Sequence, residues 1–258
     1  KVNDGVLLSG GVIALINYIS QILVELVKLA NVVIVMGKAG SCLNRIGEVL
    51  DAESSIKYAE KEAEEKTDDC SVRFENVSLT YAGAGAESLT DINVDIKRGS
   101  TVGIIGGTGS GKSSLVNLIP RFYDATKGSV FVNGKNVKDM TREELLSSVA
   151  IVDQKPLLFS GTIRSNMQWG KNNATDEEIW RALELAQAAE FVRKKDGGLD
   201  EKVSRGGANF SGGQKQRLSI ARALMTNAPI IIFDDSSSAL DYATDAALRH
   251  ALKTLPKD

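Results

Sequence analysis

Residues 106–113 read GGTGSGKS, and this short stretch decides the fold. It fits the pattern G-x-x-x-x-G-K-[ST] of a phosphate-binding loop. Glycines in such a loop let the backbone bend, so that successive N–H groups point inward at phosphate oxygens. Lys112 adds a positive charge for the outer phosphates, and the Ser113 hydroxyl can hold Mg²⁺. The alternative is a glycine-rich turn that only precedes a helix.

The surrounding pattern supplies the strand and the helix that the loop requires. Residues 101–106 are a continuous apolar run, and the runs at 149–153 and 230–234 are alike, as expected for strands buried on both faces. Residues 72–81 and 92–97 alternate apolar and polar side chains, which favours an antiparallel sheet. Strands that alternate with helices predict an α/β layered domain. The helices are expected at residues 112–118, 142–146, 176–184 and 213–224.

Two further motifs carry a family resemblance. Residues 209–217 read NFSGGQKQR, and residues 230–241 read IIIFDDSSSALD. Together with the loop they resemble the nucleotide-binding half of an ATP-binding-cassette (ABC) transporter, of the exporter type with a membrane domain fused in front. The resemblance covers essentially the whole chain. It implies an α/β, P-loop NTPase-type ABC ATPase domain with a mainly parallel core sheet, an antiparallel β subdomain and a helical signature subdomain, preceded by a transmembrane helix.

The resemblance assigns ATP to the phosphate-binding loop. Tyr81 stands where the family places an aromatic ring that stacks on adenine, and a flat ring offers a flat base a large contact area at little entropic cost. The alternative for Tyr81 is an ordinary tyrosine at the end of a strand. The expected ATP-binding residues are Tyr81, Gly106, Gly107, Thr108, Gly109, Ser110, Gly111, Lys112, Ser113 and Ser114.

Mg²⁺ is the expected cofactor, with Ser113, Gln154 and Asp234 as its ligands. Asp234 ends an apolar strand, and a carboxylate delivered there beside the loop is a standard way to hold Mg²⁺ through water. Gln154 resembles the family's glutamine, which reaches Mg²⁺ and the attacking water and touches the membrane domain. The alternatives are a structural carboxylate that caps the next turn and a loop glutamine without a role.

Asp235 departs from the family pattern. The family has a glutamate after the Mg²⁺ aspartate, and that glutamate polarises the attacking water. Aspartate keeps the charge but draws the carboxylate back by roughly 1 Å or more. A misplacement of about 1 Å can cost on the order of 10²-fold in rate. With Asp235 and Gln154 as its catalytic residues, the site is expected to bind ATP and to hydrolyse it poorly, which is typical of one half of an asymmetric, heterodimeric exporter.

The signature Ser211, Gly212, Gly213 and Gln214 precedes a predicted helix, whose free N–H groups and partial positive charge suit an anion. In the family these residues act in trans, on the γ-phosphate held by a second ABC half-transporter subunit. Phe210 replaces the common leucine, and Arg205 lies where exporters often carry a glutamate. The stretch Ser238, Ala239, Leu240 and Asp241 matches the family's D-loop, which passes along the dimer interface.

The chain is expected to have three regions. Residues 1–52 form the last transmembrane helix and its cytosolic extension, residues 53–71 a charged, solvated linker, and residues 72–258 the nucleotide-binding domain. Residues 6–24 form an uncharged run, and this run is as long as one membrane crossing. The alternative is a buried helix of a soluble domain. The polar residues that follow a helical spacing here are Asn17, Gln21, Glu25 and Lys28.

Composition and the chain ends narrow the function classes. The net charge is −2, from 31 basic and 33 acidic residues, so no nucleic-acid partner is expected. Cys42 and Cys70 lack metal-type spacing, which suits a reducing compartment. Since Lys1 is not an initiator methionine and His250 lies too near the D-loop to be the family's switch histidine, we expect the chain to begin inside a longer protein and its domain to be C-terminally incomplete.

Transport is the favoured function: an integral membrane protein with a cytoplasmic nucleotide-binding domain, in a lipid bilayer, exports a substrate that the sequence does not name. One alternative is a soluble cassette ATPase that acts in repair, translation or cluster assembly. The other is a regulatory cassette that binds ATP and serves as an interaction partner, which Asp235 favours.

The polar stripe of the first helix is predicted to line the substrate path, because polar residues within a membrane usually face a bundle interior or a water-filled cavity. Cysteines introduced at Asn17 and Gln21 of the full-length protein should then react with water-soluble thiol reagents faster than cysteines on the opposite face. Slower labelling at Asn17 and Gln21 would refute the assignment.

Overall fold

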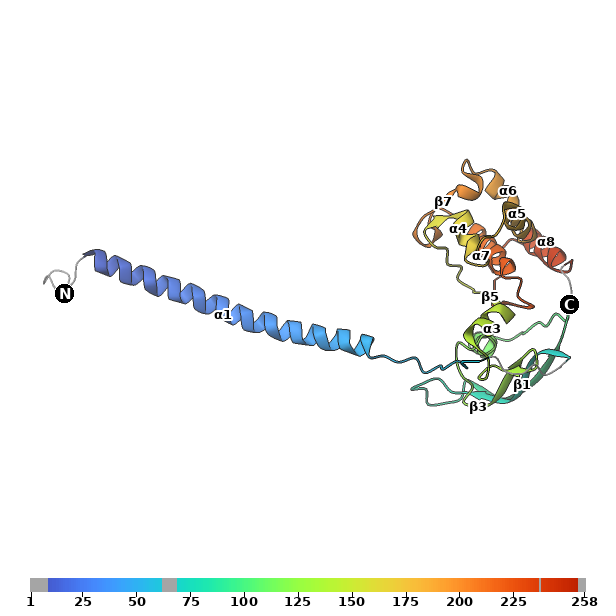
Figure 1. Cartoon of the computed structure of the whole chain (residues 1–258), viewed down its shortest axis with the longest axis horizontal. Helices are drawn as coiled ribbons and strands as arrows, with labels where there is room; N and C mark the ends of the chain where they lie inside the picture. Colours follow the sequence, from blue (N-terminus) through green and yellow to red (C-terminus); the bar gives the residue numbers. More distant parts are fainter. Residues whose placement is uncertain (1–8, 62–68, 237, 255–258) are drawn as a thin grey trace. The chain divides into compact units, whose positions relative to one another are not determined.

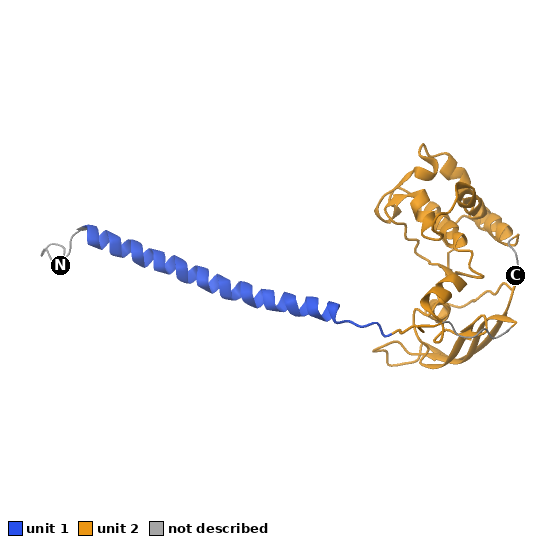
Figure 2. Cartoon of the chain, viewed as in Figure 1, with its two compact units in different colours: residues 1–55 blue, residues 56–258 orange. Residues whose placement is uncertain are grey.

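The computed structural model describes residues 9–61, 69–236 and 238–254. Residues 6–8 of the predicted crossing, 62–68 of the predicted linker, and residues 237 and 255–258 of the predicted domain lie outside the described residues. The chain divides into two compact units, residues 1–55 and 56–258 (Figure 2). Each unit is described by itself.

The first unit is a single helix, α1 (Ser9–Leu50), of 42 residues (Figure 1). Its large apolar side chains are exposed along its whole length, for example Leu15, Leu26 and Val35. By length and composition, α1 is long and apolar enough to cross a membrane. At 1.5 Å per residue it measures about 63 Å, roughly twice the hydrocarbon thickness of a bilayer.

The second unit contains every strand of the described chain and the remaining helices. Its antiparallel four-stranded sheet has the order β2-β1-β3-β4, and β5 and β8 pair in parallel. Its helices and strands are β1 (Cys70–Leu79), β2 (Leu89–Lys97), α2 (Lys112–Leu118), β3 (Lys127–Val132), β4 (Lys135–Asn136), α3 (Arg142–Ser148), β5 (Val149–Val152), β6 (Gly161–Thr162), α4 (Ile163–Gln168), α5 (Asp176–Leu185), α6 (Ala189–Arg193), β7 (Lys202–Val203), α7 (Gly212–Met225), β8 (Ile230–Phe233) and α8 (Tyr242–Leu252).

The parallel pair β5–β8 lies between two hydrophobic cores. Successive residues of a strand point to opposite faces, and both strands follow this rule. Ala150 and Val152 pack into the core built with α4, α5 and α7, whereas Val149 packs into the core of the four-stranded sheet. On β8, Ile231 faces the helical core and Ile232 faces the sheet core. Burial on both faces explains why these two strands are continuous apolar runs.

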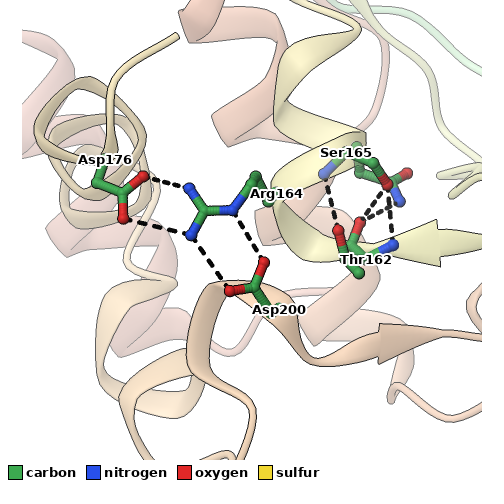
Figure 3. A network of polar contacts seen from close by, with 6 residues as sticks. Thr162, Arg164, Ser165, Asp176 and Asp200 are labelled. Carbon is green, nitrogen blue, oxygen red and sulfur yellow. Dashed lines mark hydrogen bonds and ion pairs between the residues drawn. The ribbon is translucent and has the colours of Figure 1, made fainter.

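Three helices of the helical part begin with capping boxes. Thr162 and Ser165 cap α4, and the same pair of reciprocal bonds starts α5 and α7, so that two N–H groups at each helix start are satisfied. Beside the first of these caps, the Arg164 guanidinium bonds to Asp176 and Asp200 at once (Figure 3). Arg164 thereby ties the start of α4 to the start of α5 and to the turn before β7.

Most predicted elements are confirmed, and α2 has the predicted bounds. Residues 101–106, however, were expected to form a buried strand, and this is wrong. No strand among the described residues pairs with them, and Ile105 is 98 % exposed. The prediction failed for a physical reason. An apolar run indicates a tendency to be buried, but a strand also needs a neighbouring strand with free backbone N–H and carbonyl groups. The parallel sheet therefore has two strands in the described chain, not three.

The charged segment 53–71 is not solvated throughout. The Arg121 guanidinium lies over the Tyr58 ring at 5.3 Å, and the Ala59 N–H donates to the Met140 carbonyl. Tyr58 and Ala59 are therefore packed within the second unit, which begins at residue 56, and the average composition of the segment did not predict this.

Arg164→Met should lower the melting temperature of the purified protein by a few degrees at pH 7 and by less near pH 3.5. The hydrogen bond from Arg164 lowers the pKa of Asp200. Its contribution to stability is therefore present above the unfolded pKa, about 3.9, and is lost as the pH falls through the lower folded pKa. Arg181→Met, on the exposed face of α5, is the matched control. An equal loss of melting temperature at both pH values would contradict a stabilising role for the bond between Arg164 and the Asp200 carboxylate.

Candidate nucleotide-binding site

The predicted phosphate-binding loop closes around its own lysine. The Lys112 ammonium donates to the carbonyl oxygens of Gly106 and Gly107, at 2.8 and 2.7 Å. The loop is exposed and leads directly into α2, which starts at Lys112. A positive charge is therefore held inside the curl of the loop at a helix start, which is the electrostatic arrangement that suits a phosphate.

Gly111 is one of two glycines of the loop, with Gly109, whose backbone has a positive φ. Its φ is +85°, in the left-handed region. A Cβ there would lie 2.8 Å from Leu89 Cδ2 and 3.1 Å from the Ser88 carbonyl oxygen. The positive φ and the close approach to the start of β2 together disfavour a side chain at this position.

Ser113 and Asp234 come together as predicted for a cation site. The Ser113 hydroxyl donates to the Asp234 carboxylate at 3.1 Å, although the two residues are far apart in the sequence. A hydroxyl and a carboxylate are the hard oxygen ligands that Mg²⁺ prefers. The pair therefore fits a divalent cation beside the phosphate-binding loop.

Gln154 lies beside Asp235. Its amide donates to the Asp235 carboxylate at 2.8 Å, and both side chains are exposed. The two predicted catalytic residues are thus brought together, while Gln154 reaches Asp235 and not the Ser113–Asp234 pair. Asp235 also has a φ of +47°, an uncommon conformation for a residue with a side chain. Its carbonyl accepts from the Ser238 hydroxyl at 2.9 Å, which holds the turn after β8.

Tyr81 is joined to the phosphate-binding loop. Its hydroxyl donates to the Ser114 hydroxyl at 2.8 Å, and its ring meets Tyr123 edge-to-face with centroids 5.0 Å apart. Tyr123 is 44 % exposed, so two aromatic rings stand next to the loop. Sequence reasoning found Tyr81 and missed Tyr123.

The signature residues form the start of α7. Ser211 is the N-cap: its hydroxyl accepts from the Gln214 N–H, and the Gln214 side chain accepts from the Ser211 N–H. Ser211 and Gly212 are exposed, so the helix start is accessible to a ligand. Phe210 is buried against Phe191 and belongs to the core, which accounts for an apolar residue at this position.

The D-loop lies against the signature. A Cβ on Gly213 would be 3.0 Å from the Ala239 carbonyl oxygen, so glycine allows this close approach. Asp241 caps α8 by accepting from the Thr244 N–H and hydroxyl, and these bonds lower the pKa of its carboxyl. Asp241 is therefore a helix cap in this chain, and its charge is held at the end of the D-loop.

Sequence reasoning missed the side chains behind the site. Gln216, Arg222 and Asn166 all bind the backbone of the segment that contains Gln154. Gln216 stands within the NFSGGQKQR motif, at a position of α7 that is wholly buried. A polar residue on the apolar face of a predicted helix was the available signal.

The model of the ABC transporter family matches residues 89–238. The chain belongs to the ABC transporter family. It is 39 % identical to an uncharacterized ABC transporter ATP-binding protein of Mycobacterium tuberculosis (strain ATCC 25618 / H37Rv), over 100 % of this chain and 45 % of the relative. It is 41 % identical to an uncharacterized ABC transporter ATP-binding protein of Bacillus subtilis (strain 168), over 95 % of this chain and 42 % of that protein.

Among solved structures, a bacterial Atm1-family ABC exporter with ATP bound is similar to 92 % of this chain, with a TM-score of 0.77 and 30 % identity. The match covers 42 % of that exporter chain. The predicted fold class, an ABC ATPase domain with an apolar helix in front, is thereby confirmed. The chain spans less than half the length of these relatives.

Lys112→Met in the full-length protein should weaken photolabelling of this chain by azido-ATP, raising the half-saturating concentration about tenfold or more, because a charged hydrogen-bond donor to phosphate is lost. Lys97→Met, which removes an exposed lysine of β2, is the control and should label like the wild type. Unchanged labelling of the Lys112 variant would exclude the loop as the nucleotide site.

Proposed function

We propose that this chain is the ATP-binding and ATP-hydrolysing subunit of an ABC exporter and couples closure of two nucleotide-binding domains to export across a membrane. One observation carries the proposal. The ends of β5 and β8 lie side by side, so that Asp234 meets Ser113 of the phosphate-binding loop while Asp235 meets Gln154. Family membership and the ATP-bound exporter with the same fold support it.

Each residue has a distinct task in this proposal. Lys112 and the loop N–H groups bind the phosphates of ATP, and Tyr81 stacks on the adenine. Ser113 and Asp234 would hold Mg²⁺, and Gln154 would join them on leaving Asp235; the ion would neutralise charge on the phosphates. Asp235 orients the attacking water. The Asp235 carboxylate and the Gln154 amide are both exposed and lie 2.8 Å apart, so both can contact one water once their mutual hydrogen bond is broken.

The site is proposed to bind ATP well and to hydrolyse it weakly. Aspartate holds its carboxylate roughly 1 Å or more nearer the backbone than glutamate would. In this chain the Asp235 carboxylate is also engaged by Gln154, and its backbone is fixed by Ser238. Both contacts restrain the short side chain from reaching farther toward a phosphate.

The signature residues Ser211, Gly212, Gly213 and Gln214 are proposed to complete the site of a second ABC half-transporter subunit. The capping box of α7 uses the Ser211 and Gln214 N–H groups, and the N–H groups of Gly212 and Gly213 in its exposed first turn have no acceptor within the helix and can meet an anion. An intact signature beside a weakened catalytic carboxylate favours a heterodimer, in which this chain completes its partner's competent site. In the proposed assembly α1 lies in the bilayer, the nucleotide-binding domain is cytoplasmic, and the head-to-tail closure of the two domains drives the membrane helices.

A regulatory role is the second candidate, and Asp235 favours it. A cassette that binds ATP without turning it over can act as a switch for its partner. ATP turnover that tracks substrate movement across the membrane in the full complex would favour transport. Turnover that is independent of substrate movement would favour regulation.

Ser211→Arg and Asp235→Asn test the asymmetry directly. In the full transporter, Ser211→Arg should abolish ATP turnover, because a bulky cation replaces the helix cap that faces the partner's phosphate. Asp235→Asn should lower turnover little, and Asp235→Glu should raise hydrolysis at this chain's own site.

The matched measurement is the ATPase rate of each variant complex, with ATP binding to this chain monitored by photolabelling. Labelling should persist in both Asp235 variants, which keeps a loss of binding apart from a loss of catalysis. Equal losses for Ser211→Arg and Asp235→Asn would establish two equivalent sites and contradict the heterodimer.

A further inference from the structure

The segment that carries Gln154 is held at three points by side chains from two helices. Gln216 of α7 donates to the Asp153 carbonyl at 3.3 Å, and Arg222 of α7 donates to the Leu157 carbonyl at 2.9 Å. Asn166 of α4 bonds to both the N–H and the carbonyl of Phe159 at 2.8 Å. These bonds address the backbone, so they fix the path of the segment.

Burial of the Gln216 side chain is energetically unfavourable by itself. The side chain is wholly buried, and its Oε1 has no hydrogen-bond partner among the described residues. A leucine of similar size would avoid a buried acceptor without a partner, so packing alone disfavours glutamine here. The one contact that glutamine supplies and leucine cannot is the bond to the Asp153 carbonyl.

Arg222 repeats the pattern at the other end of the segment. Burial lowers the pKa of its guanidinium, while the charge of Asp153 acts in the opposite direction. Its guanidinium lies 5.4 Å from the centre of the Phe159 ring, and its Nη1 is buried without a hydrogen-bond partner in the described chain. The half-buried guanidinium is thus held where its Nη2 donates to the Leu157 carbonyl.

The clamped segment connects two functional ends. Gln154 directly follows Asp153 and is exposed, with its amide on Asp235. The helix that supplies Gln216 and Arg222 begins with the signature, at Ser211. One rigid helix therefore presents the signature at its start and grips the Gln154 segment with two side chains farther along.

We propose that Gln216 and Arg222 are positioning residues that make the Gln154 segment and the signature helix move as one body. The inference rests on the proposed function, in which Gln154 serves this chain's own ATP and Ser211–Gln214 serve the partner's. A nucleotide that engages either end then displaces the other, so the two sites are coupled inside this chain.

The decisive variant is Gln216→Leu in the full-length transporter. It removes a buried Oε1 that lacks a partner and also the donor to the Asp153 carbonyl. These two changes act on stability in opposite directions, so the melting temperature should stay within a few degrees of the wild-type value. ATP turnover should nevertheless fall about tenfold, while the KM for ATP stays within about twofold, because the phosphate-binding loop is untouched. Amide hydrogen exchange of residues 153–159 should become faster, and Mg·ATP should no longer protect this segment and residues 211–216 together.

Gln168→Leu makes the same change at the end of α4 and is the matched control. Arg222→Met should reproduce the Gln216→Leu phenotype, and Arg222→Lys, which keeps a donor for the Leu157 carbonyl, should retain most of the turnover. Wild-type turnover and exchange in Gln216→Leu would overturn the proposal, as would a loss of activity that follows the melting temperature. Amide hydrogen exchange can be measured without ATP turnover. A transporter that lacks ATPase activity would therefore refute the proposed function, while the exchange of residues 153–159 would still test this inference.

Discussion

The parallel pairing of β5 with β8 is the constraint on which the rest of the second unit depends. Val149 pairs with Ile230 and Val152 with Phe233, and alternate side chains of both strands enter different cores. Apolar side chains on both faces hold the pair in register, since a slip by one residue would exchange the two faces. The sheet core and the helical core are therefore joined through two four-residue strands.

The site follows from where these strands end. The Asp234 N–H donates to the Val152 carbonyl at 3.0 Å, which extends the pairing by one residue and fixes Asp234 beside the loop. The next residue, Asp235, then turns into the left-handed region and directs its carboxylate to Gln154. The two adjacent aspartates thus face different partners, because Asp235 has a left-handed backbone conformation. Their separate roles in the proposed function are a consequence of this turn.

The sequence predicted those parts of the molecule that local patterns encode. The helix at Lys112–Leu118, the apolar strands β5 and β8, and the pairing of Ser113 with Asp234 follow from motif spacing and hydrophobicity. Local patterns do not predict which strands pair with each other, and residues 101–106 were wrongly predicted to form a strand for that reason. The clamp by Gln216 was also missed, because a buried amide has meaning only once the backbone carbonyl that it meets is known. Long-range contacts decide both cases, and no local pattern records them.

Three of the polar side chains proposed to bind ATP or Mg²⁺ already have a partner within the chain. Lys112 bonds to two loop carbonyls, Ser113 to Asp234 and Gln154 to Asp235. Binding of ATP must therefore exchange internal bonds for ligand bonds, and the net gain is the difference between them. The exchange favours binding at Lys112, because phosphate oxygens carry more charge than the carbonyls they replace. At Asp235 it does not, since the short carboxylate must give up Gln154 to reach a water. This difference is the physical basis of the proposal that the site binds ATP well and hydrolyses it slowly.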